Sequence, residues 1–247
     1  MTDSPTIALC FPTCNNLPIL RSTLIHNMRW ADQICVLDMG STDGTKEFLE
    51  AVLRLQDRYS RCDSNFIPND GFSAARAGIS ALAGTDWIWH GGSNCCLDWT
   101  CQQELRTALA NAKRDVVAHQ TLHVDATDDC IEVAVKKSGL RSEWHRQIHR
   151  RGVGIEMKGY IHEELYRGDQ NCHSEAEAHM EIRQYHFEGR GDDHLRRTRA
   201  AWMLRRAMNE PELRKWTNAF WFDRWVPEHQ DEIHAMAEEY QRGGVGR

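Results

Sequence analysis

Two short apolar segments near the N-terminus, separated by a helical segment, constrain the fold most strongly. TIALCFP (residues 6–12) and QICVLD (33–38) are typical of buried strands. Between them, LPILRSTLIHNMRWA (17–31) carries apolar residues at helical spacing, and Pro18 is tolerated near the helix start. This order predicts parallel strands in a doubly wound α/β sheet. Ligands on such sheets bind beyond the carboxyl ends of the strands, where Asp38 stands.

The same alternation continues along the chain. GSTDGT (40–45) is a glycine-rich turn in which Thr42 or Asp43 can cap a helix over KEFLEAVLRLQDRY (46–59). NDGFSAARAGISALAG (69–84) predicts a loop that leads into a short helix. The remaining segments are interpreted as strand DWIWH (86–90), turn GGSN (91–94), helix LDWTCQQELRTALANA (97–112), strand DVVAHQTLHV (115–124), and strands EVAVKK (132–137) and HRQIHRRGVGIEMKG (145–159).

From about residue 193 the pattern becomes helical, with a break near Pro211. We therefore predict one α/β domain over residues 1–192 and a helical C-terminal extension over 193–247 that packs on it. A chain of 247 residues is long enough for this arrangement. No apolar run approaches the roughly 18 residues that span a bilayer, and the first residues lack a basic segment followed by an apolar one. These features favour a cytoplasmic protein.

The charge distribution argues against broad binding to nucleic acid or to an anionic membrane, because the formal net charge is −6. One stretch, from residue 190 to residue 215, is nevertheless basic. Its cationic residues are Arg190, Arg196, Arg197, Arg199, Arg205, Arg206, Arg214 and Lys215. Such runs are most often solvated helix surfaces, and we favour that interpretation here.

Cysteine and histidine spacing gives no metal site. The nine cysteines form no CxxC pair and no Cys/His zinc spacing, so buried, reduced thiols are expected. Two histidine pairs, His119/His123 and His145/His149, have the four-residue separation of a helical metal site. With 13 histidines in the chain, such spacing arises easily by chance.

Four groups of residues, in order along the chain, resemble the motifs of family 2 glycosyltransferases. They are IALCFPTCNN (7–16), VLDMGSTDGT (36–45), GFSAARAGISALAGTDWI (71–88), and GYIHEEL (159–165) followed by YHFEGR (185–190). The last group is similar to the subgroup that includes lipopolysaccharide-core and peptide glycosyltransferases. The resemblance covers roughly residues 5 to 210. It implies an α/β fold of the GT-A type, with a mostly parallel twisted sheet sandwiched by helices, and a nucleotide-sugar donor.

The resemblance also implies a donor site for a nucleotide sugar, with a UDP-sugar favoured. Asp38 can accept hydrogen bonds from a uracil-like imide or a ribose hydroxyl; the alternative is a carboxylate that caps its own turn. Arg76, on a predicted loop before the central strand, can pair with the diphosphate; the alternative is a surface ion pair. Asp43 is expected to be structural. The complete set of predicted donor-binding residues is Pro12, Thr13, Asn15, Asp38, Gly40, Ser41, Arg76, Gly92, Ser93 and Asn94.

The metal motif departs from the family pattern. Where the family continues to an Asp-x-Asp pair that holds a divalent cation, this chain has Gly92, Ser93 and Asn94. Three alternatives follow. A metal, Mn²⁺ or Mg²⁺, is held by Asn94 with His90 or His186; or arginines and backbone amides hold the diphosphate without metal; or the protein is inactive. We favour weakened or absent metal dependence.

Candidate catalytic residues lie in GYIHEEL. The resemblance places a His-Glu pair near the acceptor, so Glu163 is predicted to act as base or acceptor contact, supported by His162. The alternative is that Glu163 and Glu164 begin a helix. His186 can be a metal ligand or can donate a hydrogen bond to a donor phosphate. The alternative is a core histidine beside its aromatic neighbours Tyr185 and Phe187.

The C-terminal segment is rich in large aromatic residues close to the basic run. They are Trp202, Trp216, Phe220, Trp221 and Trp225. We favour a packing role over acceptor binding, because an amphipathic helix that covers a sheet shows the same pattern.

The expected function is transfer of a sugar from a nucleotide-sugar donor to an acceptor hydroxyl, by an inverting single displacement. Two alternatives stay open. One is a non-catalytic nucleotide-sugar-binding protein with a disarmed metal motif, and the other is a transferase that modifies a hydroxylated nucleobase in DNA. Glycan and peptide acceptors also fit. An unrelated dinucleotide-binding domain lacks support, because no GxGxxG follows either early strand.

Overall fold

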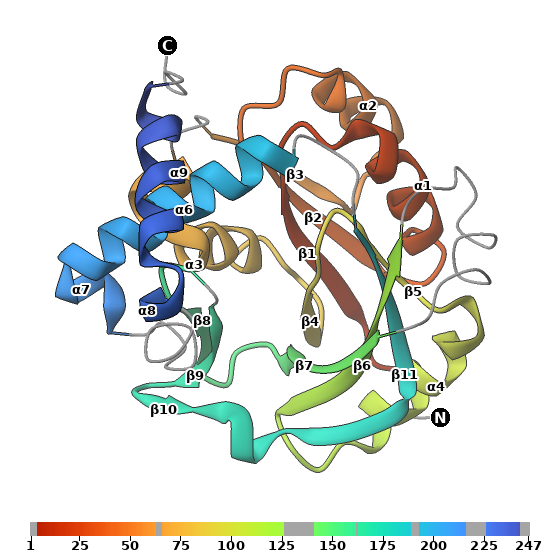
Figure 1. The fold of residues 1–247 in the computed structure, drawn as a ribbon. Coiled ribbons are helices and arrows are strands. Elements are labelled where there is room, and N and C mark those ends of the chain that lie inside the picture. The colour runs from red at the N-terminus through yellow and green to blue at the C-terminus, as the bar shows by residue number, and fades with distance from the viewer. Residues whose placement is uncertain are drawn as a thin grey trace.

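Within the residues that the structure describes, a mixed sheet of eight strands forms the centre of the molecule (Figure 1). The computed structural model describes residues 4–62, 66–125, 141–161, 163–188, 193–215 and 226–242. In spatial order the strands are β3 (Arg58–Arg61), β2 (Gln33–Asp38), β1 (Ile7–Thr13), β4 (Trp87–His90), β7 (Arg141–Arg150), β6 (Val116–Asp125), β11 (Glu177–Glu188) and β5 (Cys95–Leu97). A small antiparallel sheet contains β8 (Ile155–Lys158), β9 (Glu164–Arg167) and β10 (Gln170–Asn171).

The first four strands are parallel, and their carboxyl ends meet at one edge of the sheet. Asp38 of β2 is in register with Thr13 of β1 and with Arg61 of β3. On the other side of β1, Cys10 is in register with His90, the last residue of β4. The strand order therefore reverses direction at β1, which is the kind of switch point where α/β sheets bind ligands.

Both faces of β1, β2 and β4 are buried. Alternate residues of β1 enter different cores: Ile7 and Leu9 lie in one, and Ala8 and Cys10 lie in the other. The first core is covered by α1 (Leu17–Asn27), α2 (Thr45–Val52) and α4 (Gln102–Asn111), and the second by α3 (Phe66–Ser80), α6 (Asp193–Asn209) and α9 (Gln230–Arg242). Short helices α7 (Pro211–Arg214) and α8 (Val226–Glu228) and the 3₁₀ turns η1 (Trp99–Cys101) and η2 (Cys172–Glu175) complete the described elements.

The predicted fold class is confirmed: a curled, mostly parallel sheet lies between layers of helices (Figure 1).

The predicted helix over residues 46–59 was too long, because α2 ends at Val52 and Arg58 begins β3. The turn between them is fixed by Asp57, whose carboxylate accepts hydrogen bonds from the backbone N–H groups of Ile34 (2.8 Å) and Arg54 (2.8 Å). A carboxylate that accepts a hydrogen bond from a residue far along the chain overrides local helix propensity here.

The C-terminal helices share a core with the sheet. Met203 and Leu204 of α6 and Ile233 of α9 are buried with Ala8 and Ile79. In Figure 1, α6 and α9 pack against each other, and α6 also contacts α3. The domain boundary at residue 192 stays a prediction. None of the helices within the described ranges has the length and apolar character needed to span a membrane. Strand EVAVKK (132–137) lies outside the described residues.

Candidate functional site

Two loops that follow neighbouring parallel strands are joined by hydrogen bonds at the carboxyl edge of the sheet. Asn15, after β1, donates its backbone N–H to Ser41 Oγ (3.0 Å), and its Oδ1 accepts from the Thr42 N–H (2.8 Å). Asn15 has a φ of +46°, a left-handed conformation that asparagine tolerates better than most residues. The predicted donor-binding residues Asn15 and Ser41 are therefore brought together, in a hydrogen-bonded pair of turns.

Asp43 ties the second loop to the start of α1. Its Oδ2 accepts from the Leu17 N–H (2.9 Å), and its Oδ1 accepts from the Thr45 hydroxyl (2.6 Å). Partial burial opposes ionisation, but the hydrogen bonds from Thr45 and Leu17 outweigh it and lower the pKa of the Asp43 carboxyl. Asp43 thus has the structural environment expected of it, although Gly44, not Asp43, is the helix N-cap.

A third loop, between β4 and β5, joins the first through Ser93. The Ser93 hydroxyl accepts from Asn16 Nδ2 (2.9 Å), and its carbonyl accepts from the Thr23 hydroxyl of α1 (2.6 Å). The loop starts directly against β1, because the Gly91 N–H donates to the Cys10 carbonyl (3.0 Å). The loops after β1, β2 and β4 therefore form one connected edge.

Asp38 is fully buried at this edge. Its Oδ1 accepts from the Ser41 N–H (2.9 Å), and its Oδ2 accepts from the Tyr59 hydroxyl (3.3 Å) and lies 3.7 Å from Arg61 Nη1. These contacts match the alternative in which the carboxylate fixes its own turn. Direct contact between Asp38 and a nucleotide stays a prediction that requires this side chain to become accessible.

Arg76 and Glu163 form an ion pair at the end of β4. Arg76 Nε donates to the Glu163 carboxylate, Arg76 Nη1 donates to the Gly91 carbonyl (3.0 Å), and both side chains are only 11% exposed. The position of Arg76 was predicted wrongly, since it lies on α3 and not on a loop. Glu163 precedes β9 and begins no helix. The residues predicted for the diphosphate and for the acceptor are thus in direct contact.

Asn94 and His186 also lie together, but they bind each other. Asn94 Nδ2 donates to the Phe187 carbonyl (2.8 Å) and faces His186 Nε2 (3.1 Å), while His186 Nδ1 faces Cys95 Sγ (3.4 Å). Both ring nitrogens of His186 are directed at groups of the chain itself. Burial raises the pKa of the Cys95 thiol to about 12, so that it stays protonated.

The segment predicted to replace the Asp-x-Asp pair is a poor donor set for a hard cation. Gly92 has no side chain, and a Cβ there would lie 2.8 Å from Asn94 Oδ1. The Ser93 hydroxyl is engaged by Asn16, and Asn94 and His186 would have to separate before either could bind metal. These residues do not fit the metal that the family resemblance implies, and metal dependence stays a prediction.

His90, the other proposed ligand, lies in a buried histidine pair on the opposite side of β4 from Trp89. His90 Nε2 is 3.1 Å from His149 Nε2, and His149 Nδ1 is 2.9 Å from the Arg150 carbonyl. Since a carbonyl only accepts, His149 carries its proton on Nδ1 and accepts from His90 Nε2. Burial holds the pKa of His90 well below its ordinary value, with smaller contributions from His149 and Arg76.

Thr13 presents a second unusual group. Its side chain is buried at the carboxyl end of β1, and within the described part of the chain its hydroxyl has no hydrogen-bond partner.

Of the other predicted site residues, Pro12 is in β1, and Gly40 follows β2 with a φ of +76°. His162 and the aromatic residues Trp216, Phe220, Trp221 and Trp225 lie outside the described residues.

Sequence reasoning missed two cations near these loops. Arg61 donates to the Ser41 carbonyl (2.9 Å), and Arg199 of α6 lies beside Cys14, where it partly offsets the rise that burial causes in the pKa of that thiol. Arg61 lies two residues beyond the helix predicted over residues 46–59, in a strand that was not predicted. Arg199 belongs to the basic run, and nothing in its sequence context distinguishes it from Arg206, which pairs with Glu210 (2.8 Å).

Comparison with known proteins supports the fold. The crystal structure of S. aureus TarS matches with a TM-score of 0.51 and 12% sequence identity, over 83% of this chain and 44% of the TarS chain. This chain therefore spans less than half the length of that structure. Two structures of TarS residues 1–349, one in complex with UDP, give a TM-score of 0.49 at 12% identity, over 87% and 95% of this chain and 74% and 82% of theirs. No protein-family model matches the chain, and no curated protein matches its sequence.

Proposed function

We propose that the protein is a glycosyltransferase that moves a sugar from a nucleotide-sugar donor, with a UDP-sugar favoured, to an acceptor hydroxyl. One observation carries the proposal. Arg76 and Glu163, which are 87 residues apart in sequence, meet at the carboxyl end of β4, beside the connected loops after β1, β2 and β4. A fold of the GT-A type and the ordered family motifs support the same conclusion.

The chemistry of a diphosphate suits this edge of the sheet. Three arginines from different elements contact or approach the loops: Arg61 from β3, Arg76 from α3 and Arg199 from α6. A guanidinium fork pairs well with phosphate oxygens. Positive charge at this position also stabilises the nucleoside diphosphate as it leaves. The predicted contacts from Asn15, Ser41 and the Thr13 hydroxyl would then orient the nucleoside.

The ion pair suggests how donor binding prepares the base. Without ligand, the ion pair with Arg76 engages the Glu163 carboxylate and keeps it from accepting a proton from the acceptor. A bound diphosphate competes for the guanidinium and frees the carboxylate. Glu163 then accepts the acceptor hydroxyl proton while the new C1–O bond forms, the C1–O bond to phosphate breaks and the nucleoside diphosphate departs. A single displacement of this kind inverts the configuration at C1.

A second candidate is a nucleotide-sugar-binding protein without turnover. The mutual pairing of Asn94 with His186 and the absence of a side chain at Gly92 favour it, because both remove ligands from the metal motif. A nucleic-acid acceptor is less favoured. In the basic run, Arg205 and Arg206 already pair with Gln241 (2.7 Å) and Glu210 (2.8 Å).

The test is a thermal-shift panel of UDP, GDP, dTDP and CMP and their sugar conjugates, each with EDTA, Mg²⁺ or Mn²⁺. A ligand at about a hundred times its Kd adds roughly 2.7 kcal/mol of stability, which raises the Tm by a few degrees. We expect one nucleotide series, with UDP favoured, to stabilise the protein in EDTA as well as with metal. Sugar-nucleotide turnover in the presence of glycan, peptide or hydroxymethylated-DNA acceptors then separates the transferase from the binding protein. Failure of every nucleotide to shift the Tm would contradict both.

A further inference from the structure

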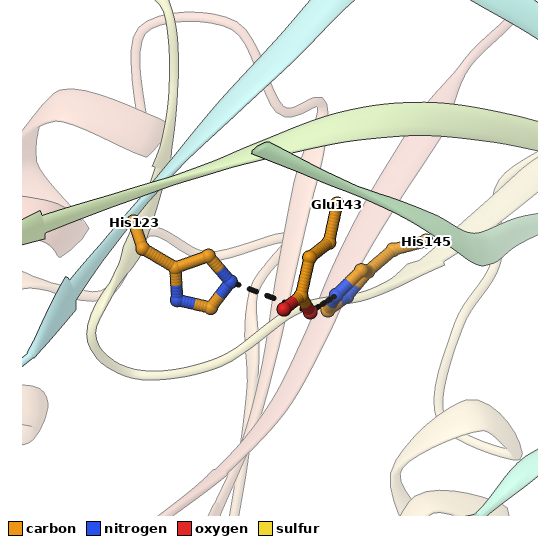
Figure 2. Close-up of side chains that lie close together, drawn as sticks. All are labelled: His123, Glu143 and His145. Carbon is orange, nitrogen blue, oxygen red and sulfur yellow. Dashed lines mark ion pairs between the residues drawn. The ribbon is translucent and has the colours of Figure 1, made fainter. Parts of the chain in front are cut away.

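Three side chains that metals commonly bind gather on β6 and β7. The Glu143 carboxylate oxygen Oε2 lies 3.6 Å from Nε2 of His123 and 3.6 Å from Nε2 of His145. Dashed lines in Figure 2 mark these two ion pairs. One potential ligand atom from each residue lies within 4.8 Å of the other two. In the described part of the chain, no other group of at least three histidine, cysteine or carboxylate side chains meets this spacing.

The backbone pairing of the two strands fixes the arrangement. In the antiparallel register of β6 and β7, Glu143 is opposite Thr121 and His145 is opposite His119. Glu143 and His145 are two residues apart, so they share a face of the sheet, and His123 lies on that face diagonally from Glu143. All three side chains point toward one another (Figure 2). Ligands on paired strands are held more rigidly than ligands on loops.

We propose that His123, Glu143 and His145 bind a divalent transition-metal ion of the zinc class and leave one coordination position open. Two imidazole nitrogens favour Zn²⁺, Co²⁺, Ni²⁺ or Cu²⁺ over Mg²⁺ or Ca²⁺. Bonds of about 2.0–2.2 Å in tetrahedral geometry place ligand atoms roughly 3.3–3.6 Å apart. The two nitrogen–oxygen separations of 3.6 Å are close to this spacing before any ion is bound.

The exposure of the three residues suits an ion that enters from solvent. The side chains of His123 and His145 are 12% and 27% exposed, whereas that of Glu143 is 46% exposed. The imidazoles are therefore partly buried, and the carboxylate is the most accessible of the three groups. Two histidines and one carboxylate with an open fourth position form the donor set of sites that activate water or polarise a bound ligand.

A neighbouring histidine gives a second, independent observation. His119 is fully buried, its ring centroid is 6.2 Å from that of His145, and neither of its ring nitrogens has a hydrogen-bond partner within the described residues. Buried nitrogens of this kind are uncommon unless an ion or a water satisfies them. On the other side, the ring of His186 is 5.0 Å from that of His123, which connects this group to the β4–β5 loop.

The test uses the reduced full chain, treated with EDTA and then titrated with Co²⁺ in the absence of nucleotide. We expect one Co²⁺ ion per chain with visible d–d absorption, displaced by Zn²⁺, and a spectrum that changes when azide is added to the open position. Glu143→Gln should weaken Co²⁺ binding by about 100-fold or more, and His145→Ala should do the same. His173→Ala is the matched control, because it removes an exposed histidine that also lies near a glutamate (3.7 Å from Glu164).

Each other outcome overturns a stated part of the proposal. A thiolate-to-cobalt charge-transfer band would assign the metal to cysteines. Unchanged Co²⁺ affinity in Glu143→Gln would reduce the group to a histidine–glutamate ion pair. Near-UV CD of this variant checks that it is folded. A Co²⁺ spectrum insensitive to azide would mean a closed site. Because no sugar nucleotide is present, none of these results depends on the proposed transferase activity.

Discussion

At the scale of single residues, the contact between Arg76 and Glu163 is the most informative feature of the candidate site. A charged pair in which each side chain is only 11% exposed is costly to desolvate unless both charges have hydrogen-bond partners. Here the Gly91 carbonyl accepts a further hydrogen bond from Arg76. If the ion pair serves stability alone, replacing Arg76 and replacing Glu163 should have the same effect on UDP binding. If the pair opens when the donor binds, the two replacements should change UDP binding and turnover differently.

The first prediction separates those two roles. Glu163→Gln should keep or strengthen UDP binding, because Arg76 is no longer held by a carboxylate, and should lower kcat by about 10²–10⁴-fold. Arg76→Ala should weaken UDP binding by about 10–100-fold, the effect of losing a charge-assisted hydrogen bond. Isothermal titration with UDP and a donor-turnover assay measure both.

The control is Arg114→Ala, because Arg114 is an exposed arginine that precedes β6, at the opposite edge of the sheet, and donates to the Ser174 carbonyl (2.9 Å). It should change neither UDP affinity nor turnover. Equal loss of UDP affinity in Glu163→Gln and Arg76→Ala would show that the pair is structural.

The buried pair of His90 and His149 predicts acid sensitivity. Burial lowers the pKa of both imidazoles, so the unfolded chain binds more protons than the folded protein at pH values just below about 6.5. Stability therefore rises with pH in that range and is lost as the pH falls. Between about pH 7.5 and 5.5, each histidine that stays neutral when folded should cost roughly 1.4 kcal/mol.

Urea unfolding at the two pH values measures this effect. His90→Gln keeps a side-chain donor toward His149 and removes the titrating ring, so the loss of stability should shrink by up to about 1.4 kcal/mol relative to the wild type. His173→Gln, at an exposed position, should keep the wild-type difference. An unaltered pH dependence in His90→Gln would show that other groups cause the sensitivity.

At the scale of secondary-structure elements, α3 depends on the close approach of the β8–β9 connection. Gly71 interrupts the helix with a φ of +84°, and a Cβ there would lie 2.9 Å from the backbone Cα of Tyr160. The Phe72 N–H donates to the Tyr160 carbonyl (3.0 Å) just beyond this point. The contact sets the position of α3, and with it the position of Arg76 relative to Glu163.

Gly71→Ala should therefore destabilise the protein by about 2 kcal/mol or more, because the left-handed backbone and the collision with backbone atoms both oppose a methyl group. Gly78→Ala in the same helix is the matched control. No atom lies within 4 Å of a Cβ at Gly78, so alanine should be neutral or should stabilise by about 0.5–1 kcal/mol. Similar free energies of unfolding for the two variants, measured in urea, would refute the role assigned to the Tyr160 contact.

At the scale of the whole molecule, the C-terminal helices are required for the second core. Met203 is 0% exposed, Leu204 4% and Ile233 1%, and they pack with residues of β1 and α3. Burial of each such side chain contributes about 1.5–3 kcal/mol, so their sum is comparable to the 5–15 kcal/mol that stabilises a typical domain. A chain that ends at residue 192 should therefore lose cooperative unfolding and bind the dye ANS.

A point variant tests the same conclusion without truncation. Ile233→Ala should cost about 2–5 kcal/mol, whereas Glu238→Ala, at an exposed position of the same helix α9, should change stability by less than about 0.5 kcal/mol. A chain ending at residue 192 that unfolds cooperatively with the wild-type midpoint would contradict a shared core and would support a separable extension.

The alternation of apolar strands and amphipathic helices was sufficient to predict β1, β2, β4 and α1. These strands are buried on both faces and the helix is buried on one face, so the spacing of their apolar residues is enough to predict them. The segments that were missed depend on distant partners. β3 is set by the hydrogen bond that the Asp57 carboxylate accepts from the Ile34 N–H at the start of β2, and β5 is set by its antiparallel pairing with β11.

For the site, the sequence by itself determined which residue types end each parallel strand, and therefore that Asn15, Asp38 and Ser41 share one edge. Only the tertiary structure decided their use. Asp38 is turned inward by the Ser41 N–H and the Tyr59 hydroxyl, and Arg76 meets Glu163 across 87 residues of chain. The histidines that were read at helical spacing lie on strands, where the pairing of β6 with β7 places His123 and His145 around Glu143. Spacing along a chain specifies neighbours only once the secondary structure and the strand register are known, and register is a property of the folded sheet.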